Sequence, residues 1–338
     1  MPQGLPCIFH LNMAASFGIL MPRWLAPRFL THKKTSLLQK KFALSLQQRK
    51  WLYLIILSFI WGTSYILIKK GLEGFAPLQL VALRIVIAGG LLLLIGFKSF
   101  STIKKEDWKW LALSGFVGSF FPMSLFAFAQ TEIDSSVTAV LNSLVPLFTL
   151  FVGLFAFGFS FTRNQLLGVL VGLLGASLLV VFGSNTNPEQ NYWYAGLVVI
   201  ATICYAANAN IIKSKLQGVS PMGIAVGNFV CILLPGLLLL PLSGTFNADV
   251  IAGDFFWSSL GYITLLCLIG TCIAKVLFNK LIQISTPVFS VSVTYLIPIV
   301  GIFWGVVDGE VFTLKQLGAS LLILAGVYIV NKKRKQLA

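Results

Sequence analysis

Long apolar runs follow one another along most of the chain, separated by short clusters of charged and turn-forming residues. An apolar helix of about 20 residues is long enough to cross the hydrocarbon core of a bilayer. Helices are favoured for such runs because a helix bonds its backbone N–H and C=O groups internally, as lipid requires. The pattern predicts ten spanning helices, at Trp51–Ile68, Leu78–Phe97, Trp110–Gln130, Ser135–Gly158, Gln165–Phe182, Tyr192–Ile212, Pro221–Leu242, Phe255–Phe278, Ser285–Val307 and Gln316–Asn331.

Charged residues fall unequally on the two sides of these spans. With the N-terminus in the cytoplasm, twenty Lys and Arg residues lie on the cytoplasmic side and three lie outside, namely Lys69, Lys70 and Lys315. Eight of the ten acidic residues lie outside. Because positive charge resists translocation, this asymmetry predicts a multi-pass protein of the cytoplasmic (inner) membrane with both termini in the cytoplasm. The net charge of +15 thus follows from topology, and no nucleic-acid partner is expected.

The spans form two halves that repeat each other. The series Ile68, Lys69, Leu72, Gly74 and Pro77 recurs 144 residues later as Ile212, Lys213, Leu216, Gly218 and Pro221. An odd number of helices in each half predicts that the second half inserts upside down. The expected fold is therefore an all-α integral membrane protein of ten transmembrane helices in two inverted five-helix repeats. The expected parts are a disordered basic cytoplasmic leader (1–50), the two repeats (51–183 and 192–331) and a basic cytoplasmic tail (332–338).

Composition excludes several classes of protein. Hydrophobic residues make up 57% of the chain and charged residues 10%, whereas a water-soluble domain carries about 25% charged residues. The two histidines, His10 and His32, precede the first span, and no cysteine spacing fits a metal site. We therefore expect no cofactor, no metal and no intramembrane enzyme. The leader lacks the features of a cleaved signal peptide, and whether translation starts at Met1, Met13 or Met21 stays open.

Several short motifs, taken in order, resemble a known family. They are Trp61-Gly62 with Tyr65 and Lys70, Leu83-Arg84, Pro146, Pro298, and the series Gly309-Glu310, Gln316-Leu317-Gly318-Ala319 and Gly326. From Trp51 to Lys332 the chain resembles the ten-helix EamA-domain branch of the drug/metabolite transporter superfamily. The first half departs from the pattern, because Gly158-Phe159-Ser160 lacks the glutamate that Glu310 supplies in the second half. The resemblance implies alternating-access movement of small metabolites, often amino acids exported from bacteria.

The expected function is therefore export of a small metabolite, such as an amino acid, across the cytoplasmic membrane. The expected partners are this small-molecule substrate and the lipid bilayer. A non-transporting membrane scaffold or receptor is the alternative from another class. Within transporters, a drug-efflux pump or a nucleotide-sugar-type exchanger is the alternative.

Two cations lie within the predicted spans, and no acid does. A charge in the membrane interior is costly unless it faces the protein interior. Arg84 and Lys275 are therefore candidates to bind an anionic group of a substrate, and the alternative is snorkelling to the interface or pairing with helix carbonyls. Because Asp and Glu are absent from the spans, we predict no carboxylate-based proton relay there.

Neutral polar residues supply the remaining candidates. They are expensive in lipid unless bonded, so they are expected to face inward, either lining a cavity or bonding neighbouring helices. The candidate substrate-binding residues among them are Tyr65, Asn142, Asn208, Asn228, Thr294 and Tyr295. Pro146 and Pro298 are candidate hinges, because proline frees the carbonyl four residues earlier, at Asn142 and Thr294.

Two local features concern helix ends and helix packing. Asp134, which precedes Ser135 and Ser136, is predicted to cap the N-terminus of the fourth span. Gly168 and Gly172 form a GxxxG pattern, which predicts either close packing within the chain or the seam of a homodimer.

Overall fold

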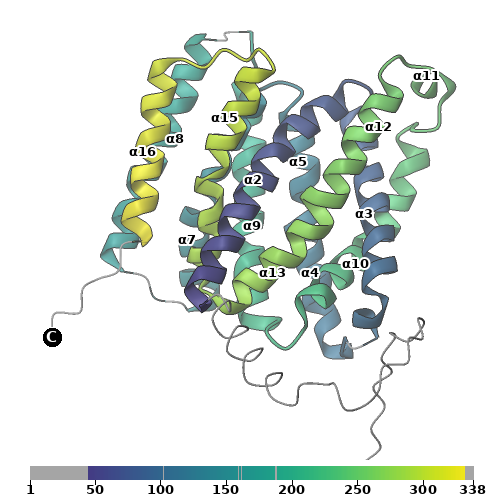
Figure 1. Cartoon of the computed structure of the whole chain (residues 1–338), viewed down its shortest axis with the longest axis horizontal. Coiled ribbons are helices and arrows are strands. Elements are labelled where there is room, and N and C mark those ends of the chain that lie inside the picture. Colours follow the sequence, from purple (N-terminus) through teal and green to yellow (C-terminus); the bar gives the residue numbers. More distant parts are fainter. Residues whose placement is uncertain (1–44, 102, 159, 161, 187–188, 332–338) are drawn as a thin grey trace, which may run out of the picture. The chain divides into compact units, whose positions relative to one another are not determined.

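The computed structural model describes residues 45–101, 103–158, 160, 162–186 and 189–331. The described residues from Leu46 onward form one compact unit, and they contain helices and no strand (Figure 1). The predicted leader lies outside the described residues up to position 44, and the predicted tail (332–338) lies outside them entirely. The last residues of the predicted leader, from Leu46, begin the first described helix.

Eight helical segments of the described chain are long and apolar enough to cross a membrane. They are Leu46–Leu72 (α2), Pro77–Phe100 (α3), Lys105–Ala129, Ser135–Phe157, Tyr192–Lys215, Pro221–Leu242 (α10), Phe256–Ile284 and Pro287–Val307. Two further helices, α8 (Arg163–Thr186) and α16 (Leu314–Asn331), cover the fifth and tenth predicted spans. The segment Tyr192–Lys215 consists of η4 (Tyr192–Tyr194) and α9 (Ala195–Lys215). The short helix α11 (Ala248–Ile251) follows α10.

Four of the crossing segments are interrupted near their middle. Two contain π-helical turns, which are η2 (Phe116–Phe120) between α4 (Trp108–Gly115) and α5 (Phe121–Ala129), and η5 (Leu266–Ile273) between α12 (Phe256–Leu265) and α13 (Ala274–Ile284). Two contain 3₁₀ turns, which are η3 (Asn142–Leu144) between α6 (Ser135–Leu141) and α7 (Val145–Phe157), and η6 (Ser292–Tyr295) between α14 (Pro287–Val291) and α15 (Ile297–Val307). The third and eighth predicted spans thus each contain a π-helical turn, and the fourth and ninth each contain a 3₁₀ turn.

Proline accounts for the 3₁₀ turns. Pro146 and Pro298 each stand near the N-terminus of the α-helix that follows the turn, and proline has no N–H to donate to the preceding turn. The expectation of a free carbonyl at Asn142 is wrong, because the turn tightens and the N–H of Val145 donates to the Asn142 carbonyl instead. Tightening to i→i+3 bonding is a common way for a helix to satisfy such groups.

Helices from the two halves pack in pairs. α8 packs along α16 and α3 packs along α10, while α2 packs on α15 and α7 on α9 (Figure 1). In the first pair, a Cβ added at Gly326 would overlap the backbone of Gly168 and Gly172. The predicted GxxxG pattern therefore serves close packing within the chain.

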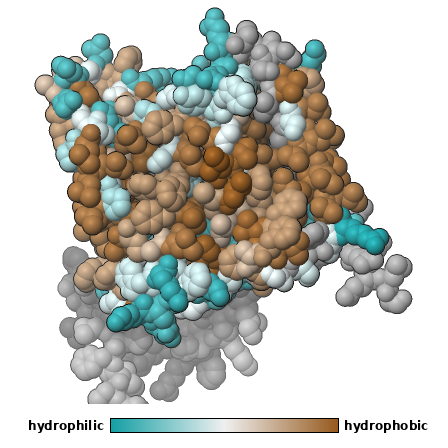
Figure 2. All heavy atoms as spheres, turned by 180° about the vertical axis from the view of Figure 1, so that it is seen from behind, coloured by the Kyte–Doolittle hydropathy of each residue, from teal (hydrophilic) through white to brown (hydrophobic). Residues whose placement is uncertain are grey.

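The outer surface of the bundle is apolar. Leu94 is 81% exposed, Phe155 80% and Leu242 80%, and Figure 2 shows one face as a broad hydrophobic band with hydrophilic residues toward both ends. Water would not favour such a surface, since large exposed apolar patches mark membrane or protein contacts. The band fits contact with lipid.

One predicted span end is wrong by six residues. The eighth predicted span ends at Phe278, whereas α13 continues to Ile284. Asn279 and Lys280 suggest an end in the sequence, but Leu281 and Ile282 beyond them are buried and continue the inward face of the helix. Lys275 consequently lies further from the helix end than the sequence suggests, which weakens the snorkelling alternative.

Candidate functional site

A cavity of about 80 Å³ lies between helices of both halves. Of the eight predicted substrate-binding residues, six line it: Tyr65, Arg84, Asn142, Asn208, Thr294 and Lys275. Asn228 and Tyr295 do not, and neither do Pro146 and Pro298. The sequence therefore grouped residues from six different helical segments that the fold brings to one place.

Both membrane cations reach this cavity. Arg84 from α3 is buried, 8% exposed, and its Nε lies 3.3 Å from the Thr271 hydroxyl in η5. Lys275 from α13 donates to the backbone carbonyl of Gly118. Within the described chain, neither cation forms an ion pair with a carboxylate, and no acidic residue lines the cavity. The cavity wall thus carries two basic side chains for which the described residues supply no acidic partner.

The π-helical turns account for two polar contacts in the cavity wall. A π-turn bonds i→i+5, so it leaves carbonyls without their usual helical partners. The Gly118 carbonyl in η2 accepts from Lys275, and the Gly270 carbonyl in η5 accepts from Trp61 Nε1 at 3.0 Å. The apolar sequence of these segments has no pattern that predicts a π-turn. The sequence therefore does not predict that the Gly118 and Gly270 carbonyls accept from Lys275 and Trp61.

Aromatic side chains form much of the remaining wall. The Tyr65 and Phe126 ring centroids lie 5.8 Å apart, and the Phe126 and Tyr205 rings stack at 5.9 Å. On the other side, the Trp61 and Phe278 rings meet edge to face at 4.9 Å. These rings supply apolar area together with faces that attract a cation. Phe126 and Phe278 were not predicted, because phenylalanine is frequent throughout the spans.

One amide oxygen in the wall lacks a hydrogen-bond partner. Asn142 in η3 is 4% exposed, and its Oδ1 accepts no hydrogen bond within the described chain. A buried polar atom left without a partner is costly, so such atoms call for an explanation such as a ligand or water. Asn142 therefore carries an unused hydrogen-bond acceptor among the residues that line the cavity.

Asn208 is hydrogen-bonded to Ser114, which in turn contacts a second asparagine. The Ser114 hydroxyl donates to Asn208 Oδ1 at 2.6 Å, and an atom of the Asn228 amide lies 3.0 Å from the same hydroxyl. These hydrogen bonds join α9, α4 and α10 behind the cavity wall. Asn228 therefore supports Asn208 without lining the cavity, while Tyr295 packs in an apolar cluster with Val140 and Leu144.

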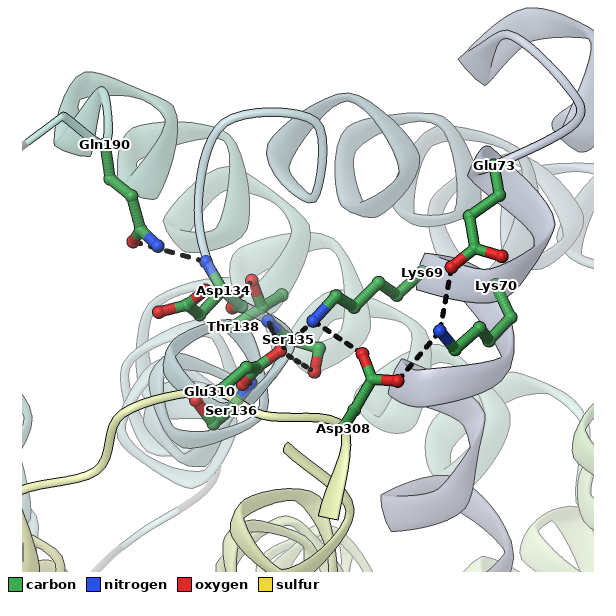
Figure 3. A network of polar contacts seen from close by, with 10 residues as sticks. All are labelled: Lys69, Lys70, Glu73, Asp134, Ser135, Ser136, Thr138, Gln190, Asp308 and Glu310. Carbon is green, nitrogen blue, oxygen red and sulfur yellow. Dashed lines mark hydrogen bonds and ion pairs between the residues drawn. The ribbon is translucent and has the colours of Figure 1, made fainter. Parts of the chain in front are cut away.

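A network of ion pairs joins the end of α2 to the loop between α15 and α16 (Figure 3). Lys69 Nζ lies 2.7 Å from Asp308 and 2.9 Å from Glu310, and Lys70 Nζ lies 2.8 Å from both Glu73 and Asp308. We refer to Lys69, Lys70, Asp308 and Glu310 as the ion-pair cluster. Ile68, which precedes Lys69, lines the cavity.

Glu310 also caps the N-terminus of α6. Its carboxylate accepts from the N–H groups of Ser135 and Ser136 at 3.2 and 3.1 Å, and from the Ser135 hydroxyl at 2.7 Å. Asp134 stands at the N-cap position of this helix, as predicted, but its side chain makes no capping hydrogen bond, and Glu310 supplies the capping carboxylate instead. Gly305 permits this arrangement, since a Cβ there would overlap the Glu310 carboxylate. The cluster therefore ties α2, α6 and the α15–α16 loop together.

The environment keeps both carboxylates ionised. Burial on its own raises the pKa of Glu310, but hydrogen bonds from Ser136, Ser135 and Lys69 outweigh burial and leave the pKa below its ordinary value. Burial likewise acts to raise the pKa of Asp308, and hydrogen bonds from Lys69 and Lys70 lower it overall. Opposite charge and hydrogen bonding to the charged form both favour a carboxylate.

An apolar helical bundle that encloses a polar cavity lined by basic side chains is an architecture that membrane transporters use. A model of the EamA-like transporter family matches residues 49–181 and 192–332. The chain belongs to this family, and the resemblance to the EamA branch of the drug/metabolite transporter superfamily is confirmed.

Individual relatives agree with the family match. The "Uncharacterized inner membrane transporter YedA" of Escherichia coli K12 is 26% identical over 291 residues, covering 83% of this chain and 90% of its own length. The "Probable amino-acid metabolite efflux pump" of Salmonella typhimurium LT2 is 26% identical over 287 residues, covering 81% and 92%. A solved crystal structure superposes with a TM-score of 0.58 at 18% identity, covering 83% of this chain and 95% of its own, which shows a shared fold.

Proposed function

We propose that this chain is a secondary transporter that exports a small amino acid or a related carboxylate compound by alternating access. The observation that carries this proposal is the pair Arg84 and Lys275 in one cavity whose described lining contains no acid. Two basic side chains buried together without a counter-ion are unfavourable in their charged forms. A substrate carboxylate would neutralise part of this charge and would bind through charge-assisted hydrogen bonds.

The proposed architecture is ten spans in two inverted five-helix repeats, with both termini in the cytoplasm. The paired interruptions support it, because η2 and η5 are π-turns in the third and eighth spans, and η3 and η6 are 3₁₀ turns in the fourth and ninth. The ion-pair cluster supports the same count, since the end of α2 and the end of α15 lie together. On the charge asymmetry of the loops, this end faces outward.

The rest of the cavity suits an amino acid. Asn142 Oδ1 could accept from an α-ammonium group, and the rings of Trp61, Tyr65 and Phe126 could attract it. The volume of about 80 Å³ is well below the range of roughly 300–1,000 Å³ that is usual for drug-sized ligands. Size therefore favours a small metabolite over a large drug. The name of the Salmonella relative, an amino-acid metabolite efflux pump, agrees with this substrate class.

A metabolite accumulation screen tests the proposal directly. Cells that express the chain and cells that lack it are loaded with labelled amino acids and related acids, and the efflux of each compound is measured. Export of a carboxylate compound, with strong loss in Arg84→Ala and in Lys275→Ala, supports the proposal. Lys215→Ala is the matched control, because Lys215 is a cation outside the cavity that stacks on Trp110.

Three outcomes would count against the proposal. Export that is unchanged in both cavity variants removes the charged site. Export restricted to cationic drugs replaces the substrate class, and transport of no compound favours the scaffold or receptor alternative.

A homodimer through Gly168 and Gly172 stays a prediction, and the occupation of that face by α16 argues against it.

A further inference from the structure

The two ends of the bundle carry matching residues but not matching charges. Lys69 at one end corresponds to Lys213 at the other, and Gln316 corresponds to Gln165. Gly309 corresponds to Gly158, and both adopt a positive φ, 89° and 67°. The glycine pair therefore agrees in backbone conformation as well as in sequence.

At the Glu310 end, Lys69 is paired with two carboxylates, Asp308 and Glu310 (Figure 3). Glu310 is buried to 3% side-chain exposure and receives Lys69 and the N-terminus of α6. Since Ser135 belongs to α6 and Lys69 to α2, neither helix can move away from the α15–α16 loop without breaking these bonds. Charge-assisted hydrogen bonds of this kind are about twice as strong as neutral ones.

At the Lys213 end, the carboxylate is missing. The sequence has Gly158-Phe159-Ser160 where the second half has Gly309-Glu310-Val311. Lys213 Nζ instead donates to the carbonyls of Ile282, Gln283 and Ser285 at 3.3, 3.4 and 2.7 Å, and no carboxylate in the described chain pairs with it. An open cavity of about 460 Å³ lies here, lined by Gly158, Ser160, Gln165, Lys213 and Thr286.

We propose that Glu310 acts as a latch, because its bonds to Lys69 and α6 hold the Glu310 end of the carrier closed. The Lys213 end has no such carboxylate in the described chain, so it is the end that is open in the resting protein. This inference rests on the proposed carrier with its inverted repeats. With the proposed orientation, the resting protein receives substrate from the cytoplasm. Release to the outside requires the Glu310 carboxylate to leave Lys69 and the α6 N–H groups.

Cysteine labelling tests the latch without knowledge of the substrate. Ile68 lines the cavity just inside the cluster, so Ile68→Cys reports access from that end to a membrane-impermeant maleimide. The full chain without Ile68→Cys gives the background from the native cysteines. Labelling is measured in intact cells and in inside-out vesicles, and is normalised to folded protein recovered by gel filtration.

Glu310→Gln is expected to raise the labelling rate in intact cells by about tenfold or more, because hydrogen bonds to a charged group are lost. Lys69→Met, which removes the other partner, is expected to act in the same direction. The matched control is Glu132→Gln. Glu132 lies just before α6, the helix whose N–H groups bind Glu310, and it forms no ion pair in the described chain.

Each outcome decides one point. Unchanged labelling in Glu310→Gln and Lys69→Met, or an equal rise in Glu132→Gln, overturns the latch. A rise in inside-out vesicles in place of intact cells supports the latch and overturns the proposed orientation. A rise in intact cells together with failure of every compound in the efflux screen supports the latch and overturns the proposed substrate class.

Discussion

Lys69 Nζ lies 2.9 Å from Glu310 Oε1, which joins the end of α2 to a residue 241 positions further along the chain. The same carboxylate caps α6, where the adjacent Asp134 makes no capping bond. A single side chain thus satisfies a lysine and a helix N-terminus that belong to the first half. Removal of the Glu310 carboxylate should therefore change both the stability of the folded chain and the opening of this end of the bundle.

The cluster should make stability depend on pH only in acid. The pKa values of Glu310 and Asp308 lie below their ordinary values in the folded chain. A depressed pKa contributes stability that is fully present above the ordinary value and is lost as pH falls through the folded value. Wild type should therefore exceed Glu310→Gln in unfolding free energy by about 1–3 kcal/mol at neutral pH, and the gap should shrink below about pH 4.

Thermal unfolding of both proteins in detergent, measured from pH 3 to pH 8, checks this expectation. The difference between the two proteins is the relevant quantity, since carboxylates outside the ion-pair cluster titrate equally in both. A gap that narrows between pH 8 and pH 6, or one that stays constant down to pH 3, would contradict the assignment.

The sequence predicted the helices well because each span is a long apolar run with charged ends, and lipid leaves few alternatives to a helix. It also grouped Arg84, Lys275 and Asn142, because polar residues in apolar helices must face inward. It did not predict Trp61 bound to the Gly270 carbonyl, because π-turns carry no sequence pattern of their own.

Long-range partners were missed for a related reason. Asp134 has a good local pattern for an N-cap, yet Glu310, which folds back from a distant loop, competes successfully for the same N–H groups. Similarly, Asn279 and Lys280 mark a plausible span end, whereas Leu281 and Ile282 extend the helix by packing inward. Local patterns therefore set the helices, and tertiary contacts decide their ends and caps.

Close packing of α8 on α16 should make Gly326 sensitive to a single methyl group. A Cβ at Gly326 would overlap the Gly168 carbonyl and the Gly172 backbone, which cannot rotate away as a side chain can. Gly326→Ala should cost about 1–3 kcal/mol of unfolding free energy, as overpacking usually does. Gly318→Ala in the same helix is the control, because no atom lies within 4 Å of an added Cβ there.

For Gly318→Ala, the helix propensity of alanine should raise stability by up to about 1 kcal/mol. The melting temperatures of both variants in the same detergent distinguish the two effects. Equal stability in the two variants would show that α8 and α16 separate without cost, which would refute the packing described above.

Asn142 should matter for the amino group of a substrate and not for its carboxylate. Its Oδ1 has no partner in the described chain, so Asn142→Leu removes an unsatisfied buried oxygen and should leave the empty protein equally or more stable. Loss of one hydrogen bond from a charged donor should weaken binding of an amino acid by about 1.5–3 kcal/mol.

Ligand-induced thermal stabilisation measures this difference. The two probes are an exported amino acid and the matching acid that lacks the α-amino group. The variant should lose stabilisation by the amino acid and keep stabilisation by the acid. An equal loss for both probes would place the role of Asn142 in the fold of the cavity.

Restoring a carboxylate at the Lys213 end should oppose the latch. Ser160 and Lys213 line one cavity, so Ser160→Glu supplies an acid beside Lys213, one residue after Phe159, which is the position that corresponds to Glu310. A new partly buried ion pair there should stabilise the closed form of that end and slow the initial rate of transport in proteoliposomes by about threefold to tenfold, equivalent to about 0.6–1.4 kcal/mol. Ser160→Gln has nearly the same size without the charge and should transport at the wild-type rate. Equal rates in the two variants would mean that Lys213, held by three carbonyls, does not accept a carboxylate, and that the ends differ for a reason other than charge.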